Sequence, residues 1–312
     1  MCGIAGIIHK KGVTSENIGA QMTSMLQALK HRGPDSTGYA VYGEDNGNQI
    51  MRLKVAEAIE LEGSYSIHAE IADRIALVDA RLAESGAKVI NKENATEYAF
   101  RYELDFSGDI KKLVDFLEDI EGVEILSIGS TLELIKDLGD ASVVSAQYGL
   151  DNFEGTHAIG HTRMATESDI DIRSAHPYWA YPFSDIAVVH NGQLTNYWTH
   201  RRDLERKGHR FSSNCDSELI AVYIANKMSD GVDLETAMRD SIDFLDGVFT
   251  YLVTTKDQLG MAKDCMAAKP MVVYEGDDMI ALASEEIAIR KLFDHQIHTF
   301  DPYEGEVKVW QH

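Results

Sequence analysis

Cysteine is scarce in this sequence of 312 residues, which holds only Cys2, Cys215 and Cys265. Their number is odd and their spacing shows no pairs, so the sequence supports neither a disulfide framework nor a thiolate zinc site. The 12 histidines show no metal-ligand spacing, and no glycine-rich stretch forms a phosphate or dinucleotide fingerprint. We therefore expect individual reduced thiols, no metal and no cofactor in this chain.

Basic side chains are also few, and long apolar runs are lacking. Lysine and arginine number 29 against 51 acidic residues, and the net charge is −22 at pH 7. This balance argues against a nucleic-acid or anionic-membrane binder that works through a basic face. No apolar run approaches the roughly 18 residues of a membrane span, and the apolar start has no basic region before it, unlike a secretory signal. We expect a cytoplasmic protein that binds small molecules or proteins, with no nucleic acid and no membrane.

The remaining composition, 44% hydrophobic and 26% charged, is typical of a globular protein with a sizeable core. Hydrophobic periodicity predicts runs of strands and runs of helices, which favours an α+β fold with largely antiparallel sheets. The expected strands are 3–8, 37–43, 156–160, 186–190, 248–254, 259–263, 271–274 and 279–283. The expected helices are 15–30, 195–207, 216–228 and 234–245.

Residues 44–155 have a character of their own. They carry 24 acidic and 10 basic side chains, so −14 of the net charge of −22 lies in this third of the chain. Apolar residues alternate over 98–106, as in a half-buried strand, and recur at helical spacing over 110–120. With a strand at 123–128 and a helix at 131–138, we expect an inserted βαβα subdomain. Both a solvated acidic face and a docking face for a basic partner would explain its charge.

Cys2 is the first chemical clue. Removal of Met1 would leave a thiol and a free α-amine on one residue, and the unperturbed pKa of an α-amine is about 7.7–8.0. Such an amine can take the thiol proton at neutral pH, which is the logic of an N-terminal nucleophile. A start codon followed by a buried cysteine is the plainer interpretation of Met-Cys alone.

Five motifs occur in a fixed order and change that interpretation. They are MCGIAGI at 1–7, HRGPDSTG at 31–38, GHTRMAT at 160–166, HNG at 190–192 and DSE at 216–218. This combination resembles the class II glutamine amidotransferases, whose glutaminase domain is an N-terminal-nucleophile hydrolase. The resemblance implies a four-layer αββα sandwich for residues 1–43 and 156–312, interrupted by the acidic subdomain at 44–155.

The resemblance also implies roles for individual residues, beginning with Cys2 as the catalytic nucleophile. Hydrolysis of an amide passes through a tetrahedral oxyanion, which needs hydrogen-bond donors aimed at the developing charge. The side-chain amide of Asn191 and the backbone N–H of Gly192 suit this catalytic role. A tight turn after a buried strand is the usual meaning of Asn-Gly and stays open as an alternative.

Substrate recognition would need a guanidinium for the α-carboxylate of glutamine and a carboxylate for its α-ammonium. Arg163 and Asp216 match these substrate-binding roles, and Thr166 would help to hold the carboxylate. The segment 164–169 looks like the loop that closes over glutamine in this family. Asp216 could instead only cap the helix that it opens, and Arg163 could form a plain surface ion pair. Arg32 is expected to support the site, locally or catalytically.

The sub-family follows from the segments 155–160, 161–168 and 175–177, which look closest to stand-alone amidotransferase subunits of glutamate synthase and N-methylglutamate synthase. We expect a glutaminase that hydrolyses L-glutamine and passes ammonia to a separate synthase subunit in a hetero-oligomer. FMN and iron–sulfur clusters are then expected, if anywhere, on the partner subunits. The glutaminase subunit of another amination system, or a non-catalytic regulatory subunit that senses glutamine, are the alternatives.

Overall fold

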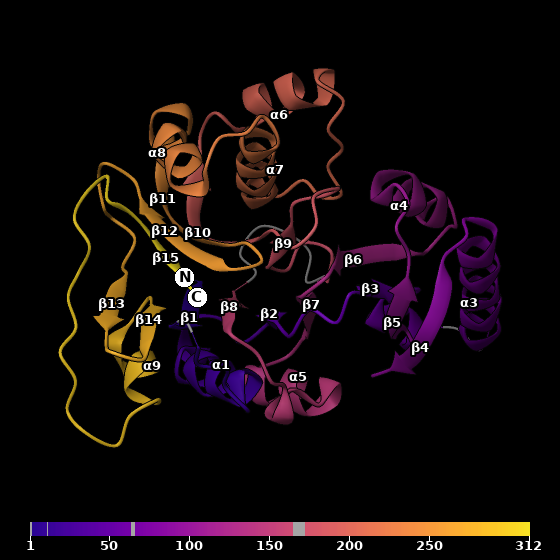
Figure 1. Cartoon of the computed structure of the whole chain (residues 1–312), viewed down its shortest axis with the longest axis horizontal. Coiled ribbons are helices and arrows are strands. Elements are labelled where there is room, and N and C mark those ends of the chain that lie inside the picture. Colours follow the sequence, from indigo (N-terminus) through magenta and orange to yellow (C-terminus); the bar gives the residue numbers. More distant parts are fainter. Residues whose placement is uncertain (1, 11, 64–65, 165–171) are drawn as a thin grey trace.

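The structure, a computed structural model, describes residues 2–10, 12–63, 66–164 and 172–312. Two antiparallel sheets form the centre of the molecule, and a third sheet lies to one side (Figure 1). The first sheet has the strand order β13 (Val272–Glu275), β14 (Met279–Ala283), β1 (Gly3–His9), β8 (His157–Arg163), β2 (Ser36–Tyr42) and β7 (Leu132–Leu138). The second has the order β15 (Val307–Gln311), β12 (Gln258–Lys263), β11 (Gly247–Thr254), β10 (Ala187–Leu194) and β9 (Tyr178–Trp179).

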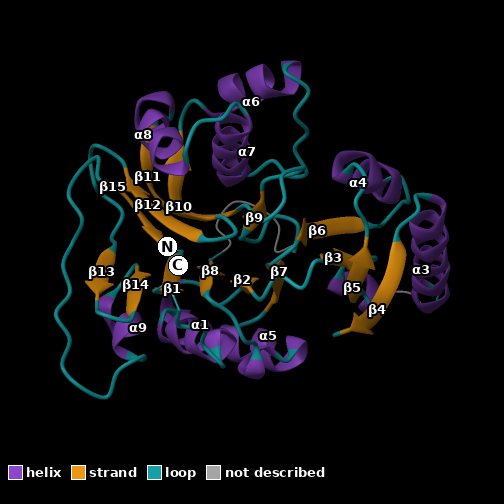
Figure 2. Cartoon of the chain, in the orientation of Figure 1, coloured by secondary structure: helices purple, strands orange, loops and turns teal. Residues whose placement is uncertain are grey.

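Helices cover the outer faces of these two sheets (Figure 2). The six-stranded sheet contacts α1 (Ile18–Ala28), α5 (Ala141–Tyr148) and α9 (Glu286–Arg290). The five-stranded sheet contacts α7 (Asp216–Ser229) and α8 (Leu234–Phe244), and α6 (Tyr197–Arg206) lies against α7. Strand β1 packs on β10, β11 and β12, so the inner faces of the two sheets meet. Strands β1 and β2 are buried along their whole length, including the polar residues Ser36 and Thr37 at the start of β2.

The third sheet belongs to the inserted segment. Its chain order is β3 (Gln49–Lys54), α2 (Ala58–Gly63), α3 (Ile67–Glu84), β4 (Lys88–Asn94), β5 (Ala99–Asp105), α4 (Ile110–Glu118) and β6 (Glu124–Gly129). The strand order is β4-β5-β3-β6 with every pair antiparallel. Apart from the short α2, this is a βαββαβ unit with two split βαβ crossovers. The expected βαβα unit therefore lacked the strands β3 and β4 and the longest helix, α3.

The predicted helix at 131–138 is wrong, because these residues form β7 and pair with β2 from Tyr42↔Leu132 to Ser36↔Leu138. The apolar pattern was misleading here because the polar residues of this strand are buried as well as the apolar ones. Glu133, Lys136 and Asp137 are each at most 5% exposed, and all three have hydrogen-bond partners inside the protein. Since β7 joins the central sheet and α5 packs on α1, residues 132–148 lie with the core, although the sequence assigned them to the insertion.

Asp185 fixes the junction between the two parts of the molecule. Its carboxylate accepts hydrogen bonds from the backbone N–H groups of Ser130, Thr131 and Leu132 at 2.9–3.1 Å and from the hydroxyls of Ser130 and Thr131. Its own backbone has φ 59°, a left-handed conformation that aspartate tolerates better than most residues. The crossing from β6 to β7 is thus held by one buried carboxylate.

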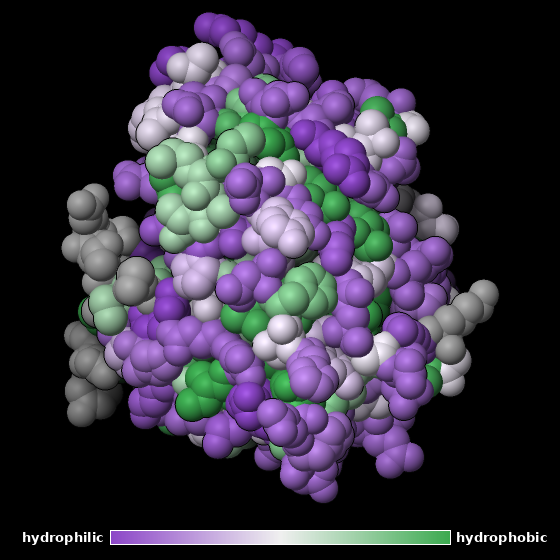
Figure 3. Space-filling model, turned by 90° about the vertical axis from the view of Figure 1, so that its left-hand side faces the viewer, coloured by the Kyte–Doolittle hydropathy of each residue, from purple (hydrophilic) through white to green (hydrophobic). Residues whose placement is uncertain are grey.

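Two further observations concern the surface. No helix in the described part of the chain is long and apolar enough to cross a membrane. Figure 3 views the side that lies at the left of Figure 1, and hydrophilic residues cover most of it, with apolar residues in small separate groups.

Candidate functional site

A cavity of about 350 Å³ lies where the end of β8, the middle of β10 and the start of α7 meet Cys2. Its lining consists of Cys2, Arg163, Met164, His176, His190, Asn191, Gly192, Cys215, Asp216, Ser217 and Lys269. A second cavity of about 640 Å³ shares Arg163, Gly192, Cys215 and Asp216 with the first, so the two adjoin. The fold therefore brings together all the predicted site residues except Arg32, which lies behind Cys2, and Thr166, which lies outside the described residues.

Cys2 is placed by the strand that follows it. β1 pairs with β8 on one side and β14 on the other, so residue 3 is already fixed opposite Thr162. A side chain at Gly3 would come within 2.8 Å of the Thr162 hydroxyl, which explains glycine at this position. Arg32 donates from Nε to the carbonyl oxygen of Cys2 at 3.0 Å and is paired with Glu285. Arg32 thus holds the main chain of Cys2 and does not line the cavity.

Asn191 and Gly192 lie within β10 and pair with Thr250 and Phe249 of β11. They do not form the turn that Asn-Gly usually signals. Asn191 is 4% exposed, and its Nδ2 has no hydrogen-bond partner among the residues that the structure describes. Gly192 has φ 157°, and a Cβ there would lie 2.2 Å from the carbonyl oxygen of Val248. A buried amide donor without a partner, next to a backbone that only glycine fits, suits the recognition of an anionic oxygen.

Asp216 is the first residue of α7, but its carboxylate does not cap that helix. Oδ2 accepts from the backbone N–H of Leu194 in β10 at 2.7 Å, and the Ser217 hydroxyl donates to Oδ1 at 3.3 Å. The residue that precedes the helix is Cys215, and its side chain makes no capping hydrogen bond. This carboxylate therefore does not cap the helix. Its hydrogen bond from Leu194 holds it at the wall of the cavity.

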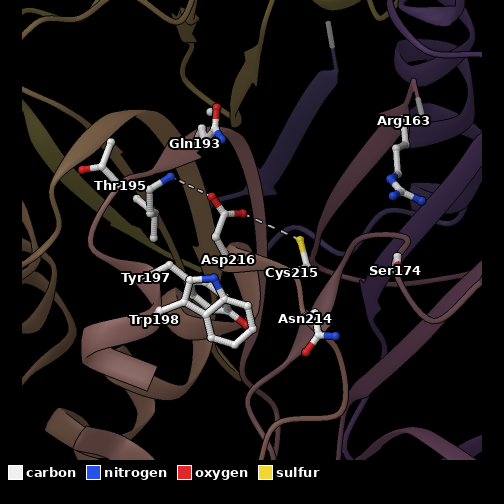
Figure 4. A pocket seen from close by; sticks show the side chains of 11 residues that line it. Arg163, Ser174, Gln193, Thr195, Tyr197, Trp198, Asn214, Cys215 and Asp216 are labelled. Atoms are coloured by element: carbon white, nitrogen blue, oxygen red, sulfur yellow. Dashed lines mark hydrogen bonds between the residues drawn. The ribbon is translucent and has the colours of Figure 1, made fainter. Parts of the chain in front are cut away.

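Arg163 ends β8 and faces Asp216 from the other side of the cavity (Figure 4). Its backbone carbonyl accepts from the N–H of Asp35 at 3.1 Å, and a Cβ at Gly33 would lie 2.4 Å from its carbonyl carbon. The HRGPD turn therefore packs directly on the main chain of Arg163. A cation and an anion on opposite walls match the two charged groups of an amino acid.

Three buried histidines lie at the site, and the motifs and segments that contain them gave them no role. The rings of His161 and His176 stack with centroids 4.0 Å apart, and the backbone N–H of His190 donates to Nδ1 of His176 at 3.3 Å. Burial lowers the pKa of His161 to about 3 and also lowers the pKa values of His176 and His190. These rings are therefore neutral at pH 7. In the described part of the chain, no group of three potential ligands is arranged to hold a metal ion.

Comparison with known proteins identifies the family. A sequence model described as "Glutamine amidotransferase domain" matches residues 161–291. A putative glutamine amidotransferase of Methanothermobacter thermautotrophicus is 39% identical over 100% of both chains. The chain belongs to the glutamine amidotransferase family. The glutamine amidotransferase-like protein GlxB of Rhizobium meliloti is 32% identical over 100% of this chain and 99% of that protein.

More distant relatives support the class. The amidophosphoribosyltransferase of Methanocaldococcus jannaschii is 30% identical over 58% of this chain and 38% of that protein. The glutamine phosphoribosylpyrophosphate amidotransferase of B. subtilis has the same fold, with a TM-score of 0.61 at 18% identity. That match covers 99% of this chain and 47% of the solved chain, so this amidotransferase spans about half the length of its structural relative. The resemblance to the class II glutamine amidotransferases is thus confirmed, and the glutamate-synthase sub-family stays a prediction.

Proposed function

We propose that this chain is the glutaminase of a class II amidotransferase, built on the four-layer αββα sandwich of N-terminal-nucleophile hydrolases, with Cys2 as its nucleophile. Glutamine hydrolysis with transfer of the ammonia is the general activity of the family. The observation that carries the proposal is one cavity that contains Cys2 and the partnerless amide of Asn191, between Arg163 and Asp216.

The proposed reaction begins after removal of Met1. The free α-amine of Cys2 takes the thiol proton, and the thiolate attacks the side-chain amide carbon of glutamine. The resulting oxyanion accepts hydrogen bonds from Asn191 and from the backbone N–H of Gly192. The C–N bond then breaks as the protonated α-amine returns its proton to the leaving ammonia. Water hydrolyses the thioester that remains on Cys2, and L-glutamate is released.

The same cavity suits an amide that is also a free amino acid better than an amide without the α-carboxylate and α-ammonium groups. Arg163 would bind the α-carboxylate and Asp216 the α-ammonium, because these side chains face each other across the cavity (Figure 4). Thr166, which lies outside the described residues, is proposed to assist at the carboxylate. A hydrolase of a larger amide would have no use for this pair of charges.

Mass spectrometry and active-site labelling test the nucleophile. We expect the active protein to begin at Cys2 and to be alkylated there by 6-diazo-5-oxo-L-norleucine, an electrophilic analogue of glutamine. Retention of Met1 in fully active protein would contradict the mechanism. A glutamine-sensing subunit without catalysis would bind glutamine but release no ammonia.

The ammonia acceptor is proposed to lie on a separate synthase subunit of the glutamate synthase or N-methylglutamate synthase type, which would carry any FMN or iron–sulfur cluster. Support comes from the segment resemblances and from the acidic insertion, which could dock on a basic face of the partner. Copurification from the native host followed by mass spectrometry tests this assignment. A copurifying amination enzyme of another type would favour the alternative, a glutaminase subunit of a different system.

A further inference from the structure

Ser174 lines the larger cavity together with Arg163 and Asp216, although no sequence motif pointed to it. Figure 4 shows Ser174 just below the guanidinium of Arg163, on the same side of the cavity and across from Asp216. Ser174 is half-buried. Ser174 is therefore placed on the side where the proposed function puts the α-carboxylate of glutamine.

The backbone on both sides of Ser174 is held by one buried ammonium group. Lys136 of β7 is 5% exposed, and its Nζ donates to the carbonyl oxygens of Arg173 at 3.2 Å and Ala175 at 3.1 Å. The same Nζ lies 5.2 Å from the centre of the Tyr178 ring. Because the two carbonyls flank Ser174, this clamp fixes the direction in which residue 174 is presented.

The inserted subdomain strengthens the clamp. Arg173 donates from Nε to Glu124 of β6 at 3.2 Å, and Lys54 of β3 lies 3.1 Å from the same carboxylate oxygen. Burial acts to raise the pKa of Glu124, but Lys54, Lys136 and Arg173 outweigh it and hold that pKa below its usual value. The carboxylate is thus ionised and joins the insertion to the segment that carries Ser174.

We propose that the Ser174 hydroxyl donates a hydrogen bond to the α-carboxylate of bound L-glutamine beside Arg163, and so contributes to selection of a free amino acid. This inference rests on the proposed glutaminase function. If Ser174 only filled the rim of the cavity, its replacement would not change recognition of the substrate's charged end. The role is one of binding, since the reacting amide lies toward Cys2.

Two electrophiles separate head-group recognition from reactivity of the thiol. 6-Diazo-5-oxo-L-norleucine carries the α-carboxylate and α-ammonium of glutamine, whereas iodoacetamide carries neither. In Ser174→Ala we expect the second-order rate of Cys2 alkylation by the first reagent to fall about tenfold, and by the second to change less than about twofold. The KM for glutamine should rise about tenfold with kcat nearly unchanged, because the bond is equally strong in the ground and transition states.

Two further variants complete the experiment. Ser174→Thr keeps the hydroxyl and should recover most of the selectivity between the reagents. Ser107→Ala removes an exposed serine of the insertion and should behave as the unchanged protein. Equal losses with both reagents, or no loss with either, would overturn the role of Ser174. If the unchanged protein neither hydrolyses glutamine nor reacts with the glutamine analogue, the proposed function itself fails.

Discussion

The central sheets and the inserted sheet are stabilised in different ways. Strands β1 and β2 are buried throughout, and their register places Cys2 and the main chain of Arg163 through backbone pairing and close glycine contacts. Strand β4 of the insertion is exposed along its whole length. This sheet meets the core through a shared apolar cluster and through ion pairs such as Arg52 and Arg101 with Glu133. The difference teaches that strand register in the core positions the site residues, while the insertion is joined to the core by apolar packing and by charge.

The largest effect should come from a residue of the central sheet. Asn191→Ala removes the proposed oxyanion donor, and we expect kcat to fall about 10²- to 10³-fold with little change in KM. Steady-state ammonia release measures both constants.

Arg163→Ala and Asp216→Ala should instead act mainly on KM, because the roles proposed for these side chains are to bind the substrate's charged groups before reaction. Lys92→Met, which removes an exposed ion pair with Asp79 inside the insertion, is the matched control and should change neither constant. The same ratio of kcat and KM effects in all three site variants would refute the separate roles.

The junction between the two regions should give the next largest effect. Asp185→Ala leaves three backbone N–H groups without their buried acceptor, and we expect a loss of about 3 kcal/mol in the free energy of unfolding. Urea unfolding measures it. Asp185→Asn keeps one acceptor oxygen and should lose less, and a variant as stable as the unchanged protein would show that the crossing does not depend on this carboxylate.

Acid should weaken the core before it weakens the ion pairs of the insertion. Burial lowers the pKa of His157 from 6.5 to about 4. The unfolded chain therefore takes up the proton first, and stability is lost from about pH 6.5 downward, by about 1.4 kcal/mol per pH unit for this ring. Burial acts to raise the pKa of Glu133, but Arg52 and Arg101 outweigh it and lower that pKa, so its contribution persists until the pH falls below about 4.3.

Urea unfolding at pH 6.5 and pH 5 tests this contrast. We expect His157→Gln to lose about 2 kcal/mol less than the unchanged protein between these two pH values. The same pH sensitivity in both proteins would mean that the protonation of His157 does not set the acid response.

The smallest effects are expected on the outer surface of the insertion. Neutralising the exposed residues Asp73, Glu93, Asp105 and Glu121 should change stability by less than about 0.5 kcal/mol and leave glutaminase activity of the isolated chain within twofold. Association with the partner should become slower at low salt if this face docks. Asp115 and Glu118 are unsuitable for this test, since both bind Arg210 of the core.

The sequence predicted the parts of the fold whose apolar pattern follows a single period. Strands near β1, β10 and β11 and helices near α7 and α8 were found within a few residues. The pattern failed at β7, where buried polar residues have partners that only the folded chain supplies. It also failed at β3 and α3, and the order of strands in the inserted sheet depends on contacts far apart in the chain.

The site residues divide in the same way, into those that sequence motifs predicted and those that only the folded chain places. The motifs indicated Cys2, Arg163, Asn191, Gly192 and Asp216, and the structure brings these residues to one cavity, although their catalytic roles stay predictions. Lys269 and Ser174 line the two cavities without a motif of their own, and His176 lies in the segment 175–177, to which no site role was given. Each is placed by a loop whose course follows from tertiary packing, which no local pattern encodes. The neighbours of known motifs, such as the AHP after Ser174, are the signal that could have found them.

The position of Cys2 directly before β1 bears on how the protein can be prepared and fused. Gly3 is already paired with Thr162 of β8, so a peptide joined ahead of Cys2 would begin beside the candidate-site cavity and would also convert the α-amine into an amide. An affinity tag on that end must be cleaved to leave cysteine first. At the other end, β15 pairs with β12 at the edge of its sheet, and His312 forms hydrogen bonds with the main-chain carbonyls of His9 and Asp257.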